Sequence, residues 1–148
     1  MNAAQAVLAF IVGVLIFAAV EVASQQLGVR SAITASLWLD AVAYGLGSLL
    51  VRLILSPLFR RGRSMAALVL AVLLFLILFP LATGLLGGLL DLSVSAGWDS
   101  PGLVRGAFTV TPINVLLTFA LELWFVAVPA AVIGAIILLV TTPARRRF

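Results

Sequence analysis

The sequence predicts an all-α, polytopic integral membrane protein with four transmembrane helices. First, 64% of the 148 residues are hydrophobic and 9% are charged, whereas soluble domains are about half apolar and about a quarter charged. Second, the apolar residues form long blocks, and runs of about 18 or more with few charges are typical of membrane-spanning helices. Third, short basic clusters flank these blocks, which is typical of topology signals rather than of a nucleic-acid-binding surface. We expect one membrane domain over residues 1–148.

The first two predicted helices cover about Ala4–Leu27 and Ala32–Leu55, with a turn at Gly28 between them. Each is long enough to cross about 30 Å of hydrocarbon at about 1.5 Å per residue. The first block lacks a basic segment before it, and Glu21 interrupts the place where a cleavage site would fall. We therefore interpret it as a membrane helix rather than a signal peptide.

The last two predicted helices cover Met65–Leu90 and Ile113–Thr141. Both are longer than a perpendicular crossing needs, so we expect tilted or kinked helices. Pro80 and Pro129 are the expected kink positions, because each proline removes a helical hydrogen bond.

The segment between these helices, Asp91–Pro112, is predicted to be an outer loop. It contains several glycines and prolines, which favour turns. It also contains apolar residues such as Trp98, which suits the headgroup level. An ordinary surface loop, a short interfacial helix and a re-entrant segment all fit this composition.

Arginine predicts the orientation. The chain contains no lysine, and two clusters hold six of its nine arginines: Arg60, Arg61, Arg63, Arg145, Arg146 and Arg147. Both clusters are expected in the cytoplasm by the positive-inside rule. Four spans place them on the same side, with both termini cytoplasmic. Exclusive use of arginine and many alanines and leucines are typical of a GC-rich prokaryotic genome, so we expect the bacterial inner (plasma) membrane.

Three acidic residues, Glu21, Asp40 and Glu122, fall within three different predicted helices. They lie about 9, 12 and 13 Å from the predicted outer ends, at about 1.5 Å per residue. A charge near the centre of a membrane helix costs about 2.5–3.5 kcal/mol, so each acid needs pairing, protonation or hydration. Arg30 and Arg105 are the expected counter-charges on the outer side.

Polar residues also recur every four positions, and residues four apart share one face of a helix. The second predicted helix carries Ser36, Asp40, Tyr44, Ser48 and Arg52, and the fourth carries Asn114, Thr118 and Glu122. The ordinary explanations are hydroxyls bonded to their own helix and an arginine that extends to the interface. We predict an intramembrane polar cluster that handles an ion or proton, contacts a partner, or only stabilises the structure: Glu21, Asp40, Tyr44, Asn114, Thr118 and Glu122.

Several chemistries lack their usual residues. Without cysteine the chain has no thiolate nucleophile or iron–sulfur ligand, and without histidine it lacks the commonest haem ligand, zinc ligand and general base. It also contains no phosphate-binding glycine loop or metal-ligand spacing. We expect no cofactor, no bound metal, no nucleic-acid partner and no enzymatic activity.

These observations favour a non-catalytic accessory or scaffold subunit of a larger membrane complex, in contact with lipid and with other subunits or with itself. The alternative is a small homo-oligomeric, cation- or proton-coupled transporter or channel that uses Asp40 and Glu122. A lipid-directed enzyme would need Asp91, Asp99 and Arg105, whose spacing matches no catalytic arrangement. The alternatives differ in the effect of Glu122→Gln: transport would stop in the second, whereas assembly would weaken or stay unchanged in the first.

Overall fold

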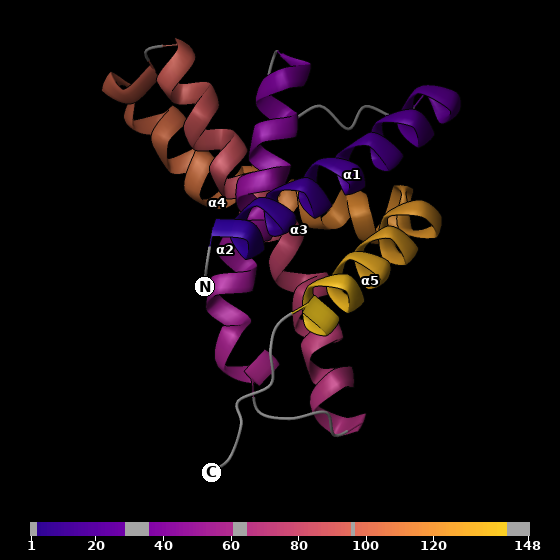
Figure 1. The fold of residues 1–148 in the computed structure, drawn as a ribbon. Coiled ribbons are helices and arrows are strands. Elements are labelled where there is room, and N and C mark those ends of the chain that lie inside the picture. Colours follow the sequence, from indigo (N-terminus) through magenta and orange to yellow (C-terminus); the bar gives the residue numbers. More distant parts are fainter. Residues whose placement is uncertain (1–2, 29–35, 61–64, 96, 142–148) are drawn as a thin grey trace.

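The computed structural model describes residues 3–28, 36–60, 65–95 and 97–141. Helices make up nearly all of this part of the chain (Figure 1). They are α1 (Ala3–Leu27), α2 (Leu37–Arg60), α3 (Met65–Ser95), the 3₁₀ turn η1 (Gly97–Asp99), α4 (Pro101–Leu117), the π-helical segment η2 (Thr118–Glu122) and α5 (Trp124–Thr141). The prediction of an all-helical, multi-pass membrane protein is confirmed, and the apolar outer faces of these helices contact lipid.

The predicted number of spans was wrong. Five helices, not four, are long and apolar enough to cross a membrane: Ala3–Leu27, Leu37–Leu58, Met65–Ser95, Pro101–Glu122 and Trp124–Thr141. The additional helix comes from residues 91–112, which were predicted to be a loop. α3 continues to Ser95, and α4 begins six residues later, at Pro101.

Packing against α3 explains why residues 101–112 form a helix. Pro101 begins α4 after an extended Ser100, and the first turn of a helix tolerates proline because its N–H would have no partner there. Pro112 lies buried within α4 and meets Gly84 of α3, where an added Cβ would lie 2.6 Å from the Pro112 Cα. The glycines and prolines that resemble turn signals therefore serve close helix contact.

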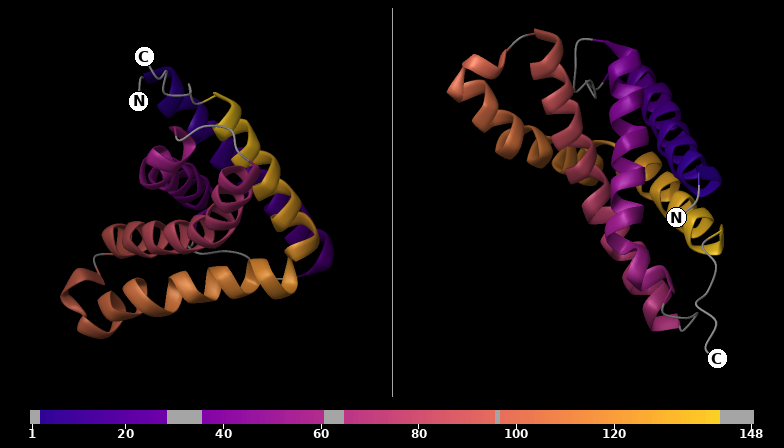
Figure 2. Two further views of the ribbon diagram at one scale, coloured as in Figure 1. Left: turned by 90° about the horizontal axis from the view of Figure 1, so that it is seen from below. Right: turned by 60° about the vertical axis from the view of Figure 1, so that its left-hand side comes forward.

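α2 and α3 lie at the centre of the helix arrangement. α2 packs against α1 and α3, α3 packs against α4, and α5 packs against both α1 and α3. The views in Figure 2 show α4 alongside α3, and α5 running back along α1. Residues far apart in the sequence, in α1 and α5, therefore form one face of the protein.

α4 and α5 meet at an elbow, which we define as residues 118–125. Leu123 leaves the helical conformation there, with φ −119° and ψ 17°, and its N–H donates to the Thr118 carbonyl at 3.0 Å. In Figure 1, α4 starts near the end of α3, and α5 runs on from the elbow toward the level of the molecule where α2 ends. The main interruption thus lies at residues 118–123, whereas α3 and α5 continue through Pro80 and Pro129.

An aromatic cluster fills the centre of the fold. The Tyr44 ring of α2 lies 5.2 Å from Phe17 of α1, 5.8 Å from Phe79 of α3 and 6.0 Å from Phe119 of η2, between centroids. Phe75 stacks on Phe79 at 5.3 Å. Such pairs contribute about 0.5–1.5 kcal/mol each beyond their buried area. Tyr44 of α2 therefore packs against α1, α3 and the elbow at once.

Candidate functional site

The polar stripe of α2 lies inside the protein. Asp40, Tyr44 and Arg52 are each 2% exposed, and Ser48 is 0% exposed. Ser36, just before α2, is half-buried, and its carbonyl accepts the Asp40 N–H at 3.2 Å. A four-residue repeat keeps these side chains near one helix face over about 18 Å, at about 1.5 Å per residue. The stripe is therefore enclosed rather than lipid-facing.

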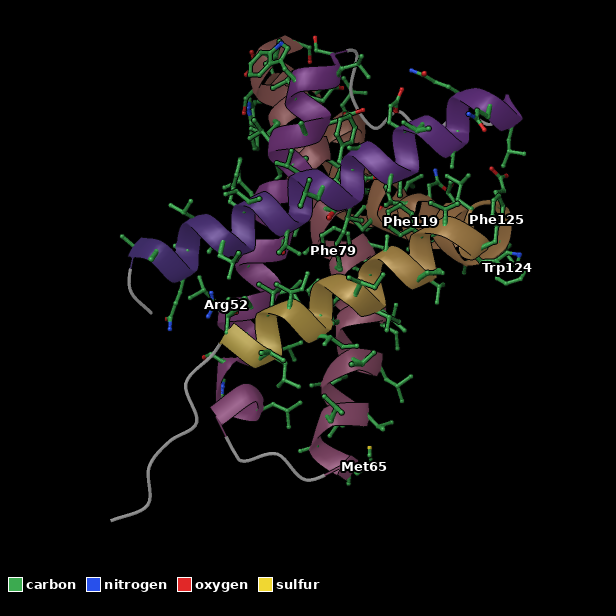
Figure 3. All side chains as sticks on the ribbon, turned by 45° about the vertical axis from the view of Figure 1, so that its right-hand side comes forward. Arg52, Met65, Phe79, Phe119, Trp124 and Phe125 are labelled. Carbon is green, nitrogen blue, oxygen red and sulfur yellow. The ribbon has the colours of Figure 1, made fainter. Side chains whose placement is uncertain are left out.

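α1 packs over the part of the stripe from Tyr44 to Arg52. A Cβ at Gly13 would overlap the Tyr44 carbonyl oxygen and lie 2.8 Å from the Ser48 Cβ, so the two backbones touch. The Arg52 guanidinium donates to the Gln5 carbonyl in the first turn of α1. Figure 3 shows Arg52 at the end of the molecule where α1 begins. Gly13 permits this contact because it has no side chain.

Two carboxylates gather at the other end of the stripe. Both Glu21 of α1 and Asp40 of α2 lie within electrostatic range of the Tyr44 side chain. Glu21 is half-buried, and its carboxylate accepts a hydrogen bond from Gln25 at 3.1 Å. Asp40 also has an interaction partner. Glu21 and Asp40, two members of the predicted cluster, therefore both act electrostatically on a third, Tyr44.

Two hydroxyls in the interior have no hydrogen-bond partner among the described residues: Ser48 and Thr83. Both side chains are 0% exposed, and Thr83 Oγ1 would lie 2.5 Å from a Cβ at Gly47. Intramembrane hydroxyls were expected to bond to their own helix, and these two do not. Thr83 was not among the predicted site residues, although it is the only polar side chain between Met65 and Leu90.

Glu122 lies apart from the buried cluster. It is exposed on η2 and has no side-chain hydrogen bond or ion pair with any described residue. Its neighbours Leu121, Trp124 and Phe125 are 70%, 58% and 45% exposed, whereas Leu123 is fully buried. Figure 3 shows Trp124 and Phe125 at the outer edge of the molecule.

The rest of the predicted stripe on the fourth helix lies on the same elbow or just before it. Asn114 is exposed on α4, and Thr118, half-buried, begins η2. The π-helical turn between Thr118 and Glu122 has more residues per turn than an α-helix, so a four-residue step no longer defines one face there. Asp40 and Glu122 therefore occupy different environments, one enclosed and one exposed.

Among the described residues, no predicted counter-charge pairs with Glu122. Arg105 is exposed on α4 and has no ion pair within the described part of the chain. Arg30 lies outside the described residues. Of the arginines predicted to set the topology, Arg60 ends α2. The other five lie outside the described ranges: Arg61, Arg63, Arg145, Arg146 and Arg147.

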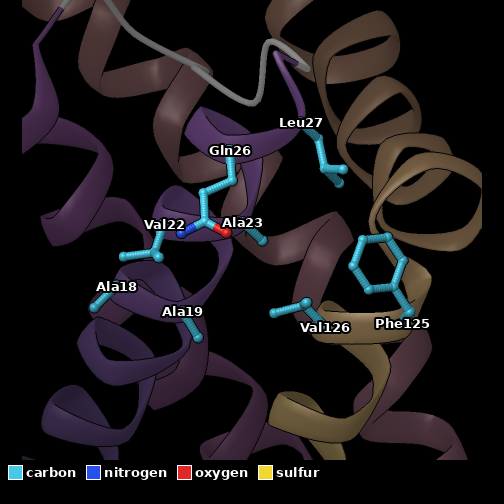
Figure 4. Close-up of a pocket in the computed structure, with 8 residues that line it drawn as sticks. All are labelled: Ala18, Ala19, Val22, Ala23, Gln26, Leu27, Phe125 and Val126. Atoms are coloured by element: carbon cyan, nitrogen blue, oxygen red, sulfur yellow. The ribbon is translucent and has the colours of Figure 1, made fainter.

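An apolar groove lies between the second half of α1 and the start of α5, with a volume of about 570 Å³. Figure 4 shows the α1 side chains opposite Phe125 and Val126. The groove is open, and Gln26 is the only polar residue among its described lining residues. Its lining is Ala18, Ala19, Val22, Ala23, Gln26, Leu27, Phe125 and Val126.

A comparison of the chain with known protein families, with curated proteins and with solved structures finds no match. The chemistry therefore follows from the geometry alone. Among the described residues, no three acidic side chains gather in a metal-binding arrangement. The enclosed stripe thus places the carboxylate of Asp40 near one end and the buried guanidinium of Arg52 at the other. Glu122 can bind a cationic or hydrogen-bonding group outside this chain.

Proposed function

We propose that the protein is a non-catalytic accessory or scaffold subunit of a larger membrane complex. The distribution of charge supports this function. The ionisable residues of the α2 stripe, Asp40 and Arg52, are enclosed between helices, whereas Glu122 is exposed beside apolar side chains. An exposed carboxylate within hydrocarbon costs about 2.5–3.5 kcal/mol, and a partner that supplies a cation or hydrogen-bond donors removes most of this cost.

The interior supports the same proposal, because it is built to hold a fixed shape. Backbones touch where α1 crosses α2 at Gly13, where α2 meets α3 at Gly47, and where α3 meets α4 at Gly84. The Tyr44 cluster then joins these helices to the elbow. A rigid body with an apolar surface and an exposed carboxylate at the elbow suits a subunit that positions neighbouring chains.

The proposal includes an orientation, with both termini on the cytoplasmic side of a bacterial inner membrane. The course of α5 back along α1 supports this orientation, because it brings the end of α5 to the side of the molecule where α1 begins (Figure 2). One of the five helices long enough to span would then not cross the bilayer completely. Both arginine clusters would face the cytoplasm, as the positive-inside rule requires.

The native mass of the complex tests the proposed function. The protein is extracted from its host in a mild detergent, its mass is measured without unfolding, and co-purifying chains are identified by mass spectrometry. We expect at least one other membrane protein at a fixed ratio. A complex that contains only copies of this chain, at the mass of a small homo-oligomer, would exclude the subunit function.

A second candidate function is proton- or cation-coupled transport, and the gathering of Glu21, Asp40 and Tyr44 favours it. Intramembrane acids that share a site are typical of proton relays. Glu122 lies outside this cluster, so the two acids have separate roles in this hypothesis. In liposomes that contain the purified protein, Asp40→Asn would stop flux, whereas the matched substitution Glu122→Gln would leave it. No flux from the unmodified protein would exclude transport by this chain alone.

A further inference from the structure

We propose that the groove between α1 and α5 receives a transmembrane helix of a partner protein, and that this helix carries an arginine or lysine that pairs with Glu122. This inference rests on the proposed function and specifies the partner. Three features carry it: the shape of the groove, the exposed carboxylate beside it, and the distribution of the protein's own arginines.

The shape of the groove suits a helix. Its α1 side contains Ala18, Ala19 and Ala23, and small residues allow two helix backbones to approach closely in a membrane. Phe125 and Val126 form the opposite side, as Figure 4 shows. The apolar side chains at its edges are exposed, so larger side chains of a partner helix can pack between them.

Polar groups beside the groove define the chemistry of the occupant. Glu122 precedes Phe125 by three residues, and Gln26 is an exposed member of the lining. Glu122 ends η2 and lies just before the N-terminus of α5, so the dipoles of these two helix ends have opposite effects on its charge. They do not offset the cost of about 2.5–3.5 kcal/mol for a charge in hydrocarbon. A cationic side chain offsets this cost, whereas an aliphatic one does not.

A second copy of this chain fits less well than a different protein. Of the arginines whose side chains are described, Arg52 is buried and donates to Gln5. Arg105 is exposed, but it lies about 25 Å from Glu122 along the helix, at about 1.5 Å per residue. Copies inserted in the same orientation hold these two groups at different depths. The described part of the chain therefore offers no cation at the level of Glu122.

Photo-crosslinking in native membranes tests the inference. A photoreactive amino acid replaces Val22 or Phe125, the two exposed edges of the groove, and Leu73 of α3 serves as an equally exposed control. We expect Val22 and Phe125 to crosslink to the same membrane polypeptide, and Leu73 not to. The peptide captured should come from a transmembrane segment that contains an arginine or lysine.

A charge exchange then tests the ion pair. Glu122→Arg should lower recovery of the partner about tenfold, which corresponds to about 1.4 kcal/mol. Replacing the cationic residue of the partner with glutamate should restore it. Glu122→Gln keeps the size of this exposed side chain, so it separates loss of charge from loss of folding, and it should reduce recovery less than the arginine does.

The remaining outcomes have distinct meanings. Crosslinks from the groove to lipid alone, while partner subunits still co-purify, would overturn the partner helix and leave the proposed function in place. Crosslinks to a second copy of this chain would overturn the inference that the partner is a different protein. If no other subunit co-purifies, both the proposed function and the inference fail.

Discussion

The rings of Tyr44 and Phe119 lie 6.0 Å apart between centroids, and this contact joins the two parts of the candidate site. Tyr44 belongs to the buried polar stripe of α2, and Phe119 belongs to the elbow that exposes Glu122. The same Tyr44 ring also meets Phe17 and Phe79. Packing around the buried Tyr44 ring therefore fixes the position of the elbow, where Glu122 is exposed.

Removing the Tyr44 ring should loosen the whole fold. Replacement of a buried aromatic residue by alanine costs about 3–5 kcal/mol, because contacts are lost and a cavity remains. We expect Tyr44→Ala to lower the midpoint of thermal unfolding in detergent markedly. Tyr44→Phe keeps all three ring contacts and should stay close to the unmodified protein. An equal decrease of the unfolding midpoint in both variants would show that the Tyr44 hydroxyl, rather than its ring, stabilises the centre of the fold.

A side chain at Gly13 should separate α1 from α2. Its Cβ would overlap the Tyr44 carbonyl oxygen and lie 2.8 Å from the Gly45 Cα, and these backbone atoms cannot move independently. We expect Gly13→Ala to destabilise the fold by about 1–3 kcal/mol, as overpacking does. Gly106→Ala is the matched control, since nothing lies within 4 Å of an added Cβ there. Chemical unfolding in detergent measures both, and unchanged stability of Gly13→Ala would contradict the close contact.

The unpaired hydroxyl of Thr83 should be dispensable. Its Oγ1 is buried without a partner among the described residues, and an unsatisfied polar atom costs about 1–3 kcal/mol. Thr83→Val has nearly the same shape and removes this cost, so thermal stability should be unchanged or higher. Ser48→Ala tests the second hydroxyl in the same way. A clear loss of stability in Thr83→Val would mean that the hydroxyl binds water or another group.

The absence of cysteine makes the orientation directly measurable. Single cysteines at Met65, at the start of α3, at Thr141, at the end of α5, and at Asp99 in η1 can be labelled with a membrane-impermeant maleimide. We expect positions 65 and 141 to react only after the cells are opened, and position 99 to react in intact cells. Labelling of 65 and 141 from opposite sides would show that α4 and α5 cross the bilayer separately.

Much of the fold and part of the site could be predicted from local sequence. Long apolar blocks require lipid on their outer faces whatever their neighbours are, so composition alone predicted a multi-pass helical protein. The stripe from Asp40 to Arg52 also follows from a helical repeat, because four polar residues on one face favour burial against protein rather than lipid. Both features depend on periodicity and transfer cost, which are properties of single segments.

Contacts between distant segments decided the rest. Residues 91–112 contain turn-forming residues, yet they extend α3 and begin α4, because Gly84 and Gly88 of α3 leave room for Pro112 and Ala107 of α4. The helix breaks at Leu123 rather than at Pro129. That break turns Glu122 outward while Asp40 stays inside. Sequence thus determined that the chain is a multi-pass helical membrane protein. Tertiary packing determined how many helices it forms and which acid is exposed, because the pattern within one segment does not depend on the residues that pack against it.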